Sequence, residues 1–275
     1  MMQSFTTSDG LNLVYRDEGE GLPVLCLSGL TRNSTDFNYM APYAKDVRLI
    51  RLDMRGRGQS DFDPEYNNYN VIREGGDALE LLDYLNIRKA AIIGTSRGGI
   101  IAMGFAKNHH DRLLGAMIND IGPVLETVGT DVIMGFLGQP PIFKSYRDAE
   151  AKLPVNSVGF ANVPTERWHQ EVRNRWVEKP DGLHLRYDPK LRDALLAQSH
   201  GDNVDLWDYF DAFADLPIAL VRGENSDLLS RKTVAEMQRR KPDMIYAEVK
   251  DRAHIPYLDE PECLQVLEQF LRKIR

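Results

Sequence analysis

The stretch Gly94-Thr95-Ser96-Arg97-Gly98-Gly99 decides how this 275-residue chain folds. An apolar run over residues 90–93 precedes it, and an apolar helical pattern begins at Ile100. A serine at so tight a strand-to-helix turn has a strained backbone and an outward-pointing hydroxyl, and the flanking glycines let strand and helix approach closely. The stretch therefore predicts a nucleophile elbow with Ser96 at its tip.

Short apolar runs alternate with helical patterns on both sides of this turn. The chain opens with a hairpin-like pair over 5–7 and 11–15, around Asp9-Gly10. Further strands are predicted at 24–27, 47–50, 90–93, 113–118, 218–221 and 244–247, and helices at 71–85, 233–240 and 264–274. Such an alternation predicts an α/β fold with a mostly parallel central sheet and helices on both faces.

The alternation breaks once, between Pro123 and Leu216. Several prolines interrupt this stretch, and its amphipathic pieces are typical of short helices. We expect residues 123–216 to form a helical cap inserted into a core domain of residues 1–122 and 217–275. The stretch contains all three tryptophans, and these are expected to pack inside the cap rather than line a pocket: Trp168, Trp176 and Trp207.

Composition narrows the class of partner. The formal net charge is −7, which argues against nucleic acid or an anionic membrane surface, so a small-molecule substrate is expected. The N-terminal residues do not resemble a signal peptide, and no apolar run reaches the roughly 18 residues of a membrane span, so a cytoplasmic protein is expected. Only Cys26 and Cys263 are present, too few for a disulfide framework or a zinc cluster, and they are expected to be buried. The oligomeric state stays open.

An elbow serine needs a base within hydrogen-bond reach and a carboxylate that holds the base in the right tautomer. His254 follows the last predicted strand, and Asp227 follows the strand before it, so the chain order Ser, Asp, His is met. We therefore predict Ser96, Asp227 and His254 as catalytic residues. Glu224 on the same loop and Asp120, after the strand at 113–118, are the alternative acids.

The tetrahedral intermediate of acyl transfer needs backbone N–H donors aimed at its oxyanion. The N–H of Arg97, directly after the serine, is one candidate, and the N–H of Leu30, after the strand at 24–27, is the other. The Arg97 side chain has two interpretations: an ion pair beneath the elbow, which we favour, or a contact to a substrate carboxylate.

With these features the chain resembles the α/β-hydrolase superfamily with a helical cap, over almost its full length. The run from Asp53 to Asp61 resembles the family's loop after its fourth strand, and the run from His254 to Glu262 resembles its histidine loop. One departure is Ser28-Gly29, where the family often has His-Gly. The serine at the elbow excludes haloalkane dehalogenases and epoxide hydrolases of this fold, which have aspartate there. Lipases with a His-Gly-Gly-Gly loop are disfavoured because no such run exists.

Together these observations predict a serine hydrolase that acts on a small-molecule ester or lactone through an acyl-enzyme intermediate, with no cofactor and no metal. Three alternatives remain. A carbon–carbon bond hydrolase of ring-cleavage diketone products would use the same fold and triad. A non-catalytic ligand-binding protein could be built on the same scaffold. Transfer of the acyl group to an acceptor other than water would also use the same intermediate.

Overall fold

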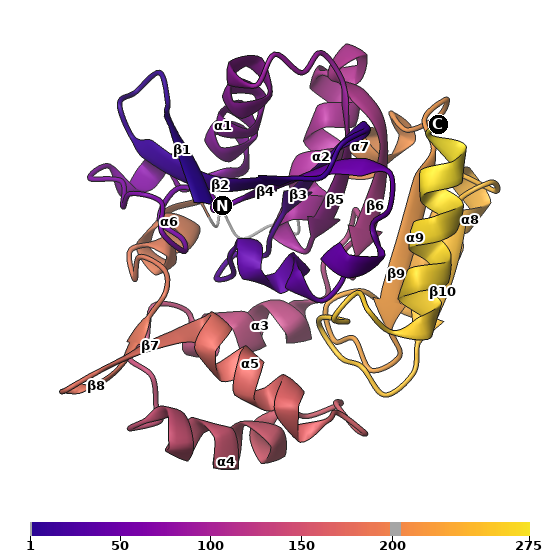
Figure 1. The fold of residues 1–275 in the computed structure, drawn as a ribbon. Helices are drawn as coiled ribbons and strands as arrows, with labels where there is room; N and C mark the ends of the chain where they lie inside the picture. Colours follow the sequence, from indigo (N-terminus) through magenta and orange to yellow (C-terminus); the bar gives the residue numbers. More distant parts are fainter. Residues whose placement is uncertain (1, 199–204) are drawn as a thin grey trace.

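The computed structural model describes residues 2–198 and 205–275. Its central sheet has eight strands in the order β1-β2-β4-β3-β5-β6-β9-β10 (Figure 1). The antiparallel pairs are β1 with β2 and β2 with β4, and all other neighbours are parallel. The strands are β1 (Met2–Thr6), β2 (Asn12–Glu18), β3 (Leu22–Leu27), β4 (Val47–Leu52), β5 (Ala90–Thr95), β6 (Leu113–Asn119), β9 (Ile218–Gly223) and β10 (Ile245–Val249). The predicted α/β fold is confirmed.

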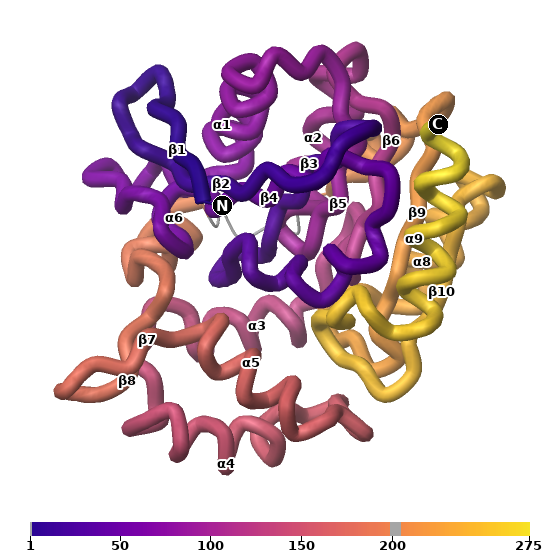
Figure 2. Tube along the Cα trace, viewed as in Figure 1, coloured from indigo at the N-terminus to yellow at the C-terminus, as the bar shows by residue number. Residues whose placement is uncertain are grey.

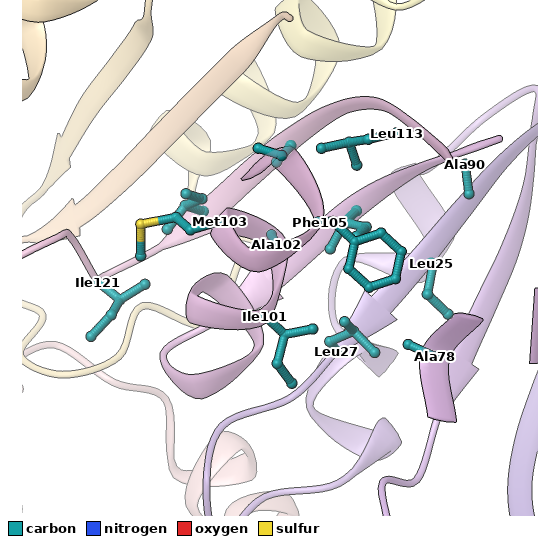
Figure 3. Close-up of a cluster of buried hydrophobic side chains, with 14 of the residues drawn as sticks. Leu25, Leu27, Ala78, Ala90, Ile101, Ala102, Met103, Phe105, Leu113 and Ile121 are labelled. Atoms are coloured by element: carbon teal, nitrogen blue, oxygen red, sulfur yellow. The ribbon is translucent and has the colours of Figure 1, made fainter. Parts of the chain in front are cut away.

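Each face of the sheet is covered by helices because successive strand residues point to opposite faces. In β3, Leu25 and Leu27 enter one buried cluster, whereas Val24 and Cys26 enter the other. The first cluster, drawn in Figure 3, is closed by α1 (Val71–Tyr84), α2 (Arg97–Asn108), α7 (Trp207–Asp211) and α8 (Arg231–Arg240). The second is closed mainly by α9 (Pro261–Lys273).

Both cysteines lie in the second cluster. Cys26 and Cys263 are fully buried and unpaired, as the sequence predicts. Burial raises the pKa of both thiols, so they act as small apolar side chains. Among the helices of the described ranges, none is long and apolar enough to cross a membrane.

Between β6 and β9, helix α6 (Leu191–Gln198) packs beside Tyr69 of the core, whereas residues 127–185 form a separate layer, drawn in magenta to salmon below the sheet in Figure 2. The elements of this layer are α3 (Thr127–Phe136), α4 (Tyr146–Asn156), α5 (Thr165–Arg175), β7 (Trp176–Lys179) and β8 (Gly182–Leu185). It has a small apolar core of its own, with Trp168 buried in it and Trp176 packed against it. The hairpin β7–β8 was not expected from the sequence. Residues 199–204, inside the predicted cap, lie outside the described ranges.

The last part of the predicted cap packs with the core instead. Phe210 and Phe213 are buried in the main cluster beside α2, and Trp207 packs against the same cluster. The Arg240 guanidinium lies 4.3 Å from the centre of the Trp207 ring. The expectation that Trp207 lies in the cap is therefore wrong, because α7 buries its apolar face against the sheet layer before the chain enters β9.

Helix α2 crosses the sheet at two glycines. A Cβ on Gly94 would lie 2.4 Å from the Gly98 carbonyl oxygen, and a Cβ on Gly98 would lie 2.0 Å from the Leu27 carbonyl oxygen. These separations are far inside van der Waals contact, and backbone atoms cannot swing aside as a side chain can. The glycines at the elbow are required by this close approach, as the sequence predicts.

Substituting glycines along α2 tests this packing. We expect Gly98→Ala to lower the free energy of unfolding by at least about 2 kcal/mol, because the added methyl group collides with the β3 backbone. Gly104→Ala, on the same helix with open space around the new methyl group, is expected to raise it by about 0.5–1 kcal/mol. Urea unfolding followed by circular dichroism measures both. Equal effects of the two substitutions would contradict the close approach.

Candidate active site

Ser96 lies between the end of β5 and the start of α2. Its backbone has φ 49° and ψ −115°, a conformation that costs a non-glycine residue about 1–3 kcal/mol and persists only where the surroundings enforce it. Its N–H donates to the Asn119 carbonyl at the end of the neighbouring strand β6, at 3.0 Å. The residue is 8% exposed. The strained turn thus presents one hydroxyl at the carboxyl edge of the sheet.

His254, on the loop after β10, connects this hydroxyl to a carboxylate. Its Nε2 lies 3.0 Å from Ser96 Oγ, and its Nδ1 lies 2.8 Å from Asp120 Oδ2. Asp120 is fully buried, whereas the His254 side chain is 16% exposed. The three groups form a continuous hydrogen-bonded chain from a buried carboxylate to a hydroxyl at the surface of the core.

The carboxylate in this chain is Asp120 rather than the predicted Asp227, so that prediction needs correcting. Strands β6 and β9 are neighbours, so the loops after both reach the same edge of the sheet. Asp120 turns there with φ 55° and accepts hydrogen bonds from Gly223 N–H at 2.8 Å and Ser226 Oγ at 2.7 Å. Asp227 makes no hydrogen bond or ion pair with any described residue. The loop after β9 contributes the hydroxyl of Ser226, a residue that sequence reasoning missed.

Two further polar residues hold the loops around Ser96 and His254. Asn119, directly before Asp120, donates from Nδ2 to the Pro256 carbonyl on the histidine loop at 3.1 Å and accepts the Ser96 N–H on its own carbonyl. Glu224, the other alternative acid, accepts the backbone N–H of Asp251 at 3.2 Å. Asn119 carried no sequence signal beyond its position at the end of a strand.

The two predicted oxyanion donors flank the serine. The backbone N–H groups of Leu30 and Arg97 have no hydrogen-bond partner within the described ranges. Leu30 lies in a turn closed by a 3.0 Å hydrogen bond from Arg32 N–H to the Gly29 carbonyl. A Cβ on Gly29 would lie 3.6 Å from Ser96 Cβ, so this turn packs directly on the serine.

A buried carboxylate below the elbow anchors both donors. Glu74 of α1 is fully buried and accepts Arg97 Nε at 2.5 Å and Arg57 Nη1 at 2.6 Å. Arg57 Nε also donates to the Leu30 carbonyl at 2.9 Å, and Arg97 Nη2 to the Tyr69 carbonyl at 2.9 Å. Burial opposes ionisation of Glu74, but the two guanidinium groups outweigh it and hold its pKa below the ordinary value. The Arg97 side chain therefore forms the predicted ion pair beneath the elbow.

Within residues 2–198 and 205–275, no group of three or more His, Cys, Asp or Glu side chains is arranged to hold a metal ion. The site consists of a hydroxyl, an imidazole, a buried carboxylate and two free backbone donors. That set can activate a nucleophile, move a proton and stabilise a developing oxyanion.

Comparison with known proteins identifies the family of this chain. The profile of the Alpha/beta hydrolase family matches residues 24–262, and the chain therefore belongs to this family. The 3-hydroxybutyrate-oligomer hydrolase of Cupriavidus necator is 34% identical over 258 residues, which cover 90% of this chain and 87% of that protein. The 2-(acetamidomethylene)succinate hydrolase of Mesorhizobium japonicum is 26% identical over 267 residues, covering 95% and 92% of the two chains.

A solved structure is similar over nearly the whole length. The crystal structure of an alpha/beta hydrolase from Novosphingobium aromaticivorans superposes with a TM-score of 0.92 and 33% sequence identity, covering 99% of this chain and 98% of that one. Family membership and the names of these relatives support a hydrolase as the general class of activity.

Replacing the buried carboxylate tests the anchor below the elbow. We expect Glu74→Gln to lower the free energy of unfolding by about 3–5 kcal/mol, because Arg57 and Arg97 lose their charged partner in the interior. Glu80→Gln on the same helix is the control. Glu80 pairs with Ser8 and Arg73 nearer the surface, so its loss should cost less than about 1 kcal/mol. Chemical denaturation of both variants decides; similar small losses would mean that Glu74 is not a structural anchor.

Proposed function

We propose that this protein is a serine hydrolase that cleaves carboxylic esters through an acyl-enzyme intermediate. The observation that carries the proposal is the hydrogen-bonded chain in which His254 Nε2 lies 3.0 Å from Ser96 Oγ and its Nδ1 lies 2.8 Å from Asp120. A hydroxyl becomes a useful nucleophile at neutral pH only when such a base takes its proton.

The first half-reaction transfers the acyl group to the enzyme. Ser96 Oγ attacks the ester carbonyl while its proton passes to His254 Nε2, and the carbonyl oxygen becomes an oxyanion that accepts the N–H groups of Leu30 and Arg97. The tetrahedral intermediate collapses, the bond to the alcohol oxygen breaks, and His254 returns the proton to the departing alcohol. Asp120 stays ionised throughout, holds the ring in the required tautomer and stabilises the transient imidazolium.

The second half-reaction returns the enzyme to its starting state. Water gives a proton to His254 and attacks the acyl-enzyme carbonyl through a second oxyanion in the same site. Collapse breaks the bond to Ser96 Oγ, and His254 returns the proton to that oxygen. One ester and one water become one acid and one alcohol, so no external oxidant, reductant or cofactor enters the balance.

We infer a short ester of a hydroxy acid as the substrate class. Support comes from the similarity to a 3-hydroxybutyrate-oligomer hydrolase along 90% of the chain. The charges around the site also favour an uncharged substrate. Three arginines contact the elbow or the turn Gly29–Arg32 that contains Leu30, the oxyanion turn. They are Arg32, Arg57 and Arg97, and each is paired with a buried carboxylate. A neutral ester group suits such a surrounding better than an anionic one would.

Hydrolysis of a carbon–carbon bond is the second candidate, because the fold alone does not separate it from ester hydrolysis. The same serine, histidine and carboxylate would act in it. Ring-cleavage diketones carry carboxylates, however, and the pairing of Arg32, Arg57 and Arg97 leaves none of these cations for them. A non-catalytic binding protein fits less well, since binding alone does not require a hydroxyl, imidazole and carboxylate in one chain.

A substrate panel tests the proposed reaction. We expect the wild-type protein to hydrolyse short-chain nitrophenyl esters and linear 3-hydroxybutyrate dimers and trimers, and to be labelled on Ser96 by a fluorophosphonate. Ser96→Ala should do neither. Lactones and vinylogous diketones complete the panel, measured by spectrophotometry and product chromatography. Preferred turnover of a diketone would transfer the assignment to carbon–carbon hydrolysis, and an inert wild type would favour the binding protein.

A pair of substitutions tests which carboxylate orients the histidine. We expect Asp120→Asn to lower kcat on the best ester about 10³- to 10⁴-fold, because the amide no longer holds the His254 ring in its active tautomer or stabilises the imidazolium. Asp227→Asn should change kcat less than about threefold, because Asp227 makes no hydrogen bond with His254. A loss of about 1.4 kcal/mol of transition-state stabilisation would lower kcat roughly tenfold. Steady-state kinetics with active-site titration measures both. A larger loss in Asp227→Asn would restore Asp227 as the acid.

A further inference from the structure

A second buried carboxylate pairs with a residue of the oxyanion turn, Gly29–Arg32. Glu171 lies on α5 of the segment between β6 and β9, and its side chain is 1% exposed. It accepts Arg32 Nη2 at 2.8 Å, Arg175 Nη2 at 2.9 Å and the Tyr39 hydroxyl at 3.0 Å. Burial opposes its ionisation, but Arg32 and Arg175 outweigh that cost and lower its pKa. Glu171 is therefore a charged acceptor inside the protein.

Arg32 is the residue through which this charge meets the active site. Its backbone N–H closes the turn on Gly29, and its Nε donates to Asp36 at 2.8 and 3.1 Å. A Cβ on Gly29 would lie 3.5 Å from Arg32 Cγ and 3.6 Å from Ser96 Cβ. The Arg32 stem and the serine thus both lie against the same face of Gly29.

The helix that carries Glu171 is fixed to both catalytic loops. Asn33 Nδ2 donates to the Asn174 carbonyl at 3.0 Å, beside the oxyanion turn. The Arg167 guanidinium lies 3.6 Å from the centre of the Tyr39 ring and pairs with Asp259 on the histidine loop at 2.5 Å. These contacts leave α5 little freedom to move relative to the core.

The turn that contains Leu30 is consequently held between two buried acid–arginine pairs. Arg57, paired with Glu74, holds the Leu30 carbonyl, and Arg32, paired with Glu171, holds the end of the turn. An oxyanion donor is effective only when it is fixed before the reaction at the position of the developing charge. Displacements of about 1 Å in such groups can cost about 100-fold in rate.

We propose that Glu171 is a positioning residue for the oxyanion hole. From α5 it fixes Arg32, and through Arg32 it orients the Gly29–Arg32 turn so that Leu30 N–H points at the reacting carbonyl oxygen. This inference rests on the ester hydrolysis proposed above. It adds that α5, in the segment between β6 and β9, helps to position a group that stabilises the transition state. The substrate itself does not touch Glu171 in this scheme.

The experiment compares Glu171→Gln with Glu166→Gln, which lies on the same helix with a 76% exposed side chain. In Glu171→Gln we expect kcat per titrated active site to fall about 10- to 100-fold and KM to change less than about threefold, because the donor matters mainly in the transition state. Glu166→Gln should match the wild type. Arg32→Lys, which keeps the charge but loses the planar fork, should show the same loss as Glu171→Gln.

Two readouts separate positioning from general damage. If Glu171 acts through Arg32, the Glu171→Gln/Arg32→Lys double variant loses no more kcat than either single variant. Hydrogen exchange in residues 28–36 should also accelerate in Glu171→Gln and not in Glu166→Gln. Additive losses, an increase in KM with kcat unchanged, or unaltered exchange would each overturn the proposal. A wild type without esterase activity would overturn the proposed function instead, and the exchange result would still report whether Glu171 orders the turn.

Discussion

The close crossing of α2 over β3 and β5 is the constraint on which the candidate active site depends. At Gly94 and Gly98 the backbones come so near that no side chain fits between them. The chain can make this crossing only through a turn in which Ser96 takes a positive φ. The geometry of sheet and helix therefore places its hydroxyl at the carboxyl edge of the sheet, and the hydrogen bond from its N–H to the Asn119 carbonyl joins the turn to the next strand.

Three buried carboxylates hold the residues around this turn, and each holds a different group. Asp120 orients the imidazole, Glu74 supports the elbow and the oxyanion turn from the core, and Glu171 contacts the same turn from the inserted segment. A buried carboxylate is costly unless its partners satisfy it. All three accept at least three hydrogen bonds from neighbouring groups, so the cost of burial is offset. The same hydrogen bonds fix the positions of the surrounding loops.

The sequence predicts what depends on local patterns. Short continuous apolar runs located the strands, and the glycines around Ser96 located the elbow, because both signals lie within a few neighbouring residues. The carboxylate that pairs with His254 could not be identified in this way. Asp120 and Asp227 both follow strands whose ends meet at one edge, and the choice depends on a backbone turn and on hydrogen bonds from Gly223 and Ser226, about a hundred residues away in the chain.

The same limit explains the errors in the inserted segment. Trp207 looks like its neighbours in sequence, yet α7 packs on the core because Phe210 and Phe213 find an apolar surface beside α2. The hairpin β7–β8 is held by pairing between two four-residue strands, which are too short to give a periodic signal. The pairs Arg32–Glu171 and Arg57–Glu74 join residues 139 and 17 positions apart in the chain, so neither ion pair could be predicted from spacing.

One hydrogen bond, from Leu206 N–H to the Pro123 carbonyl at 2.9 Å, has a consequence for how this scaffold can diversify. It joins the points where the chain leaves the core and returns to it, three residues after Asp120 and shortly before α7. The chain between Pro123 and Leu206 is an insertion whose two ends lie together. Another segment could replace it without altering the order of the strands in the sheet. A replacement of that kind would keep Ser96, His254 and Asp120 in place, but it would have to provide its own buried anion for Arg32.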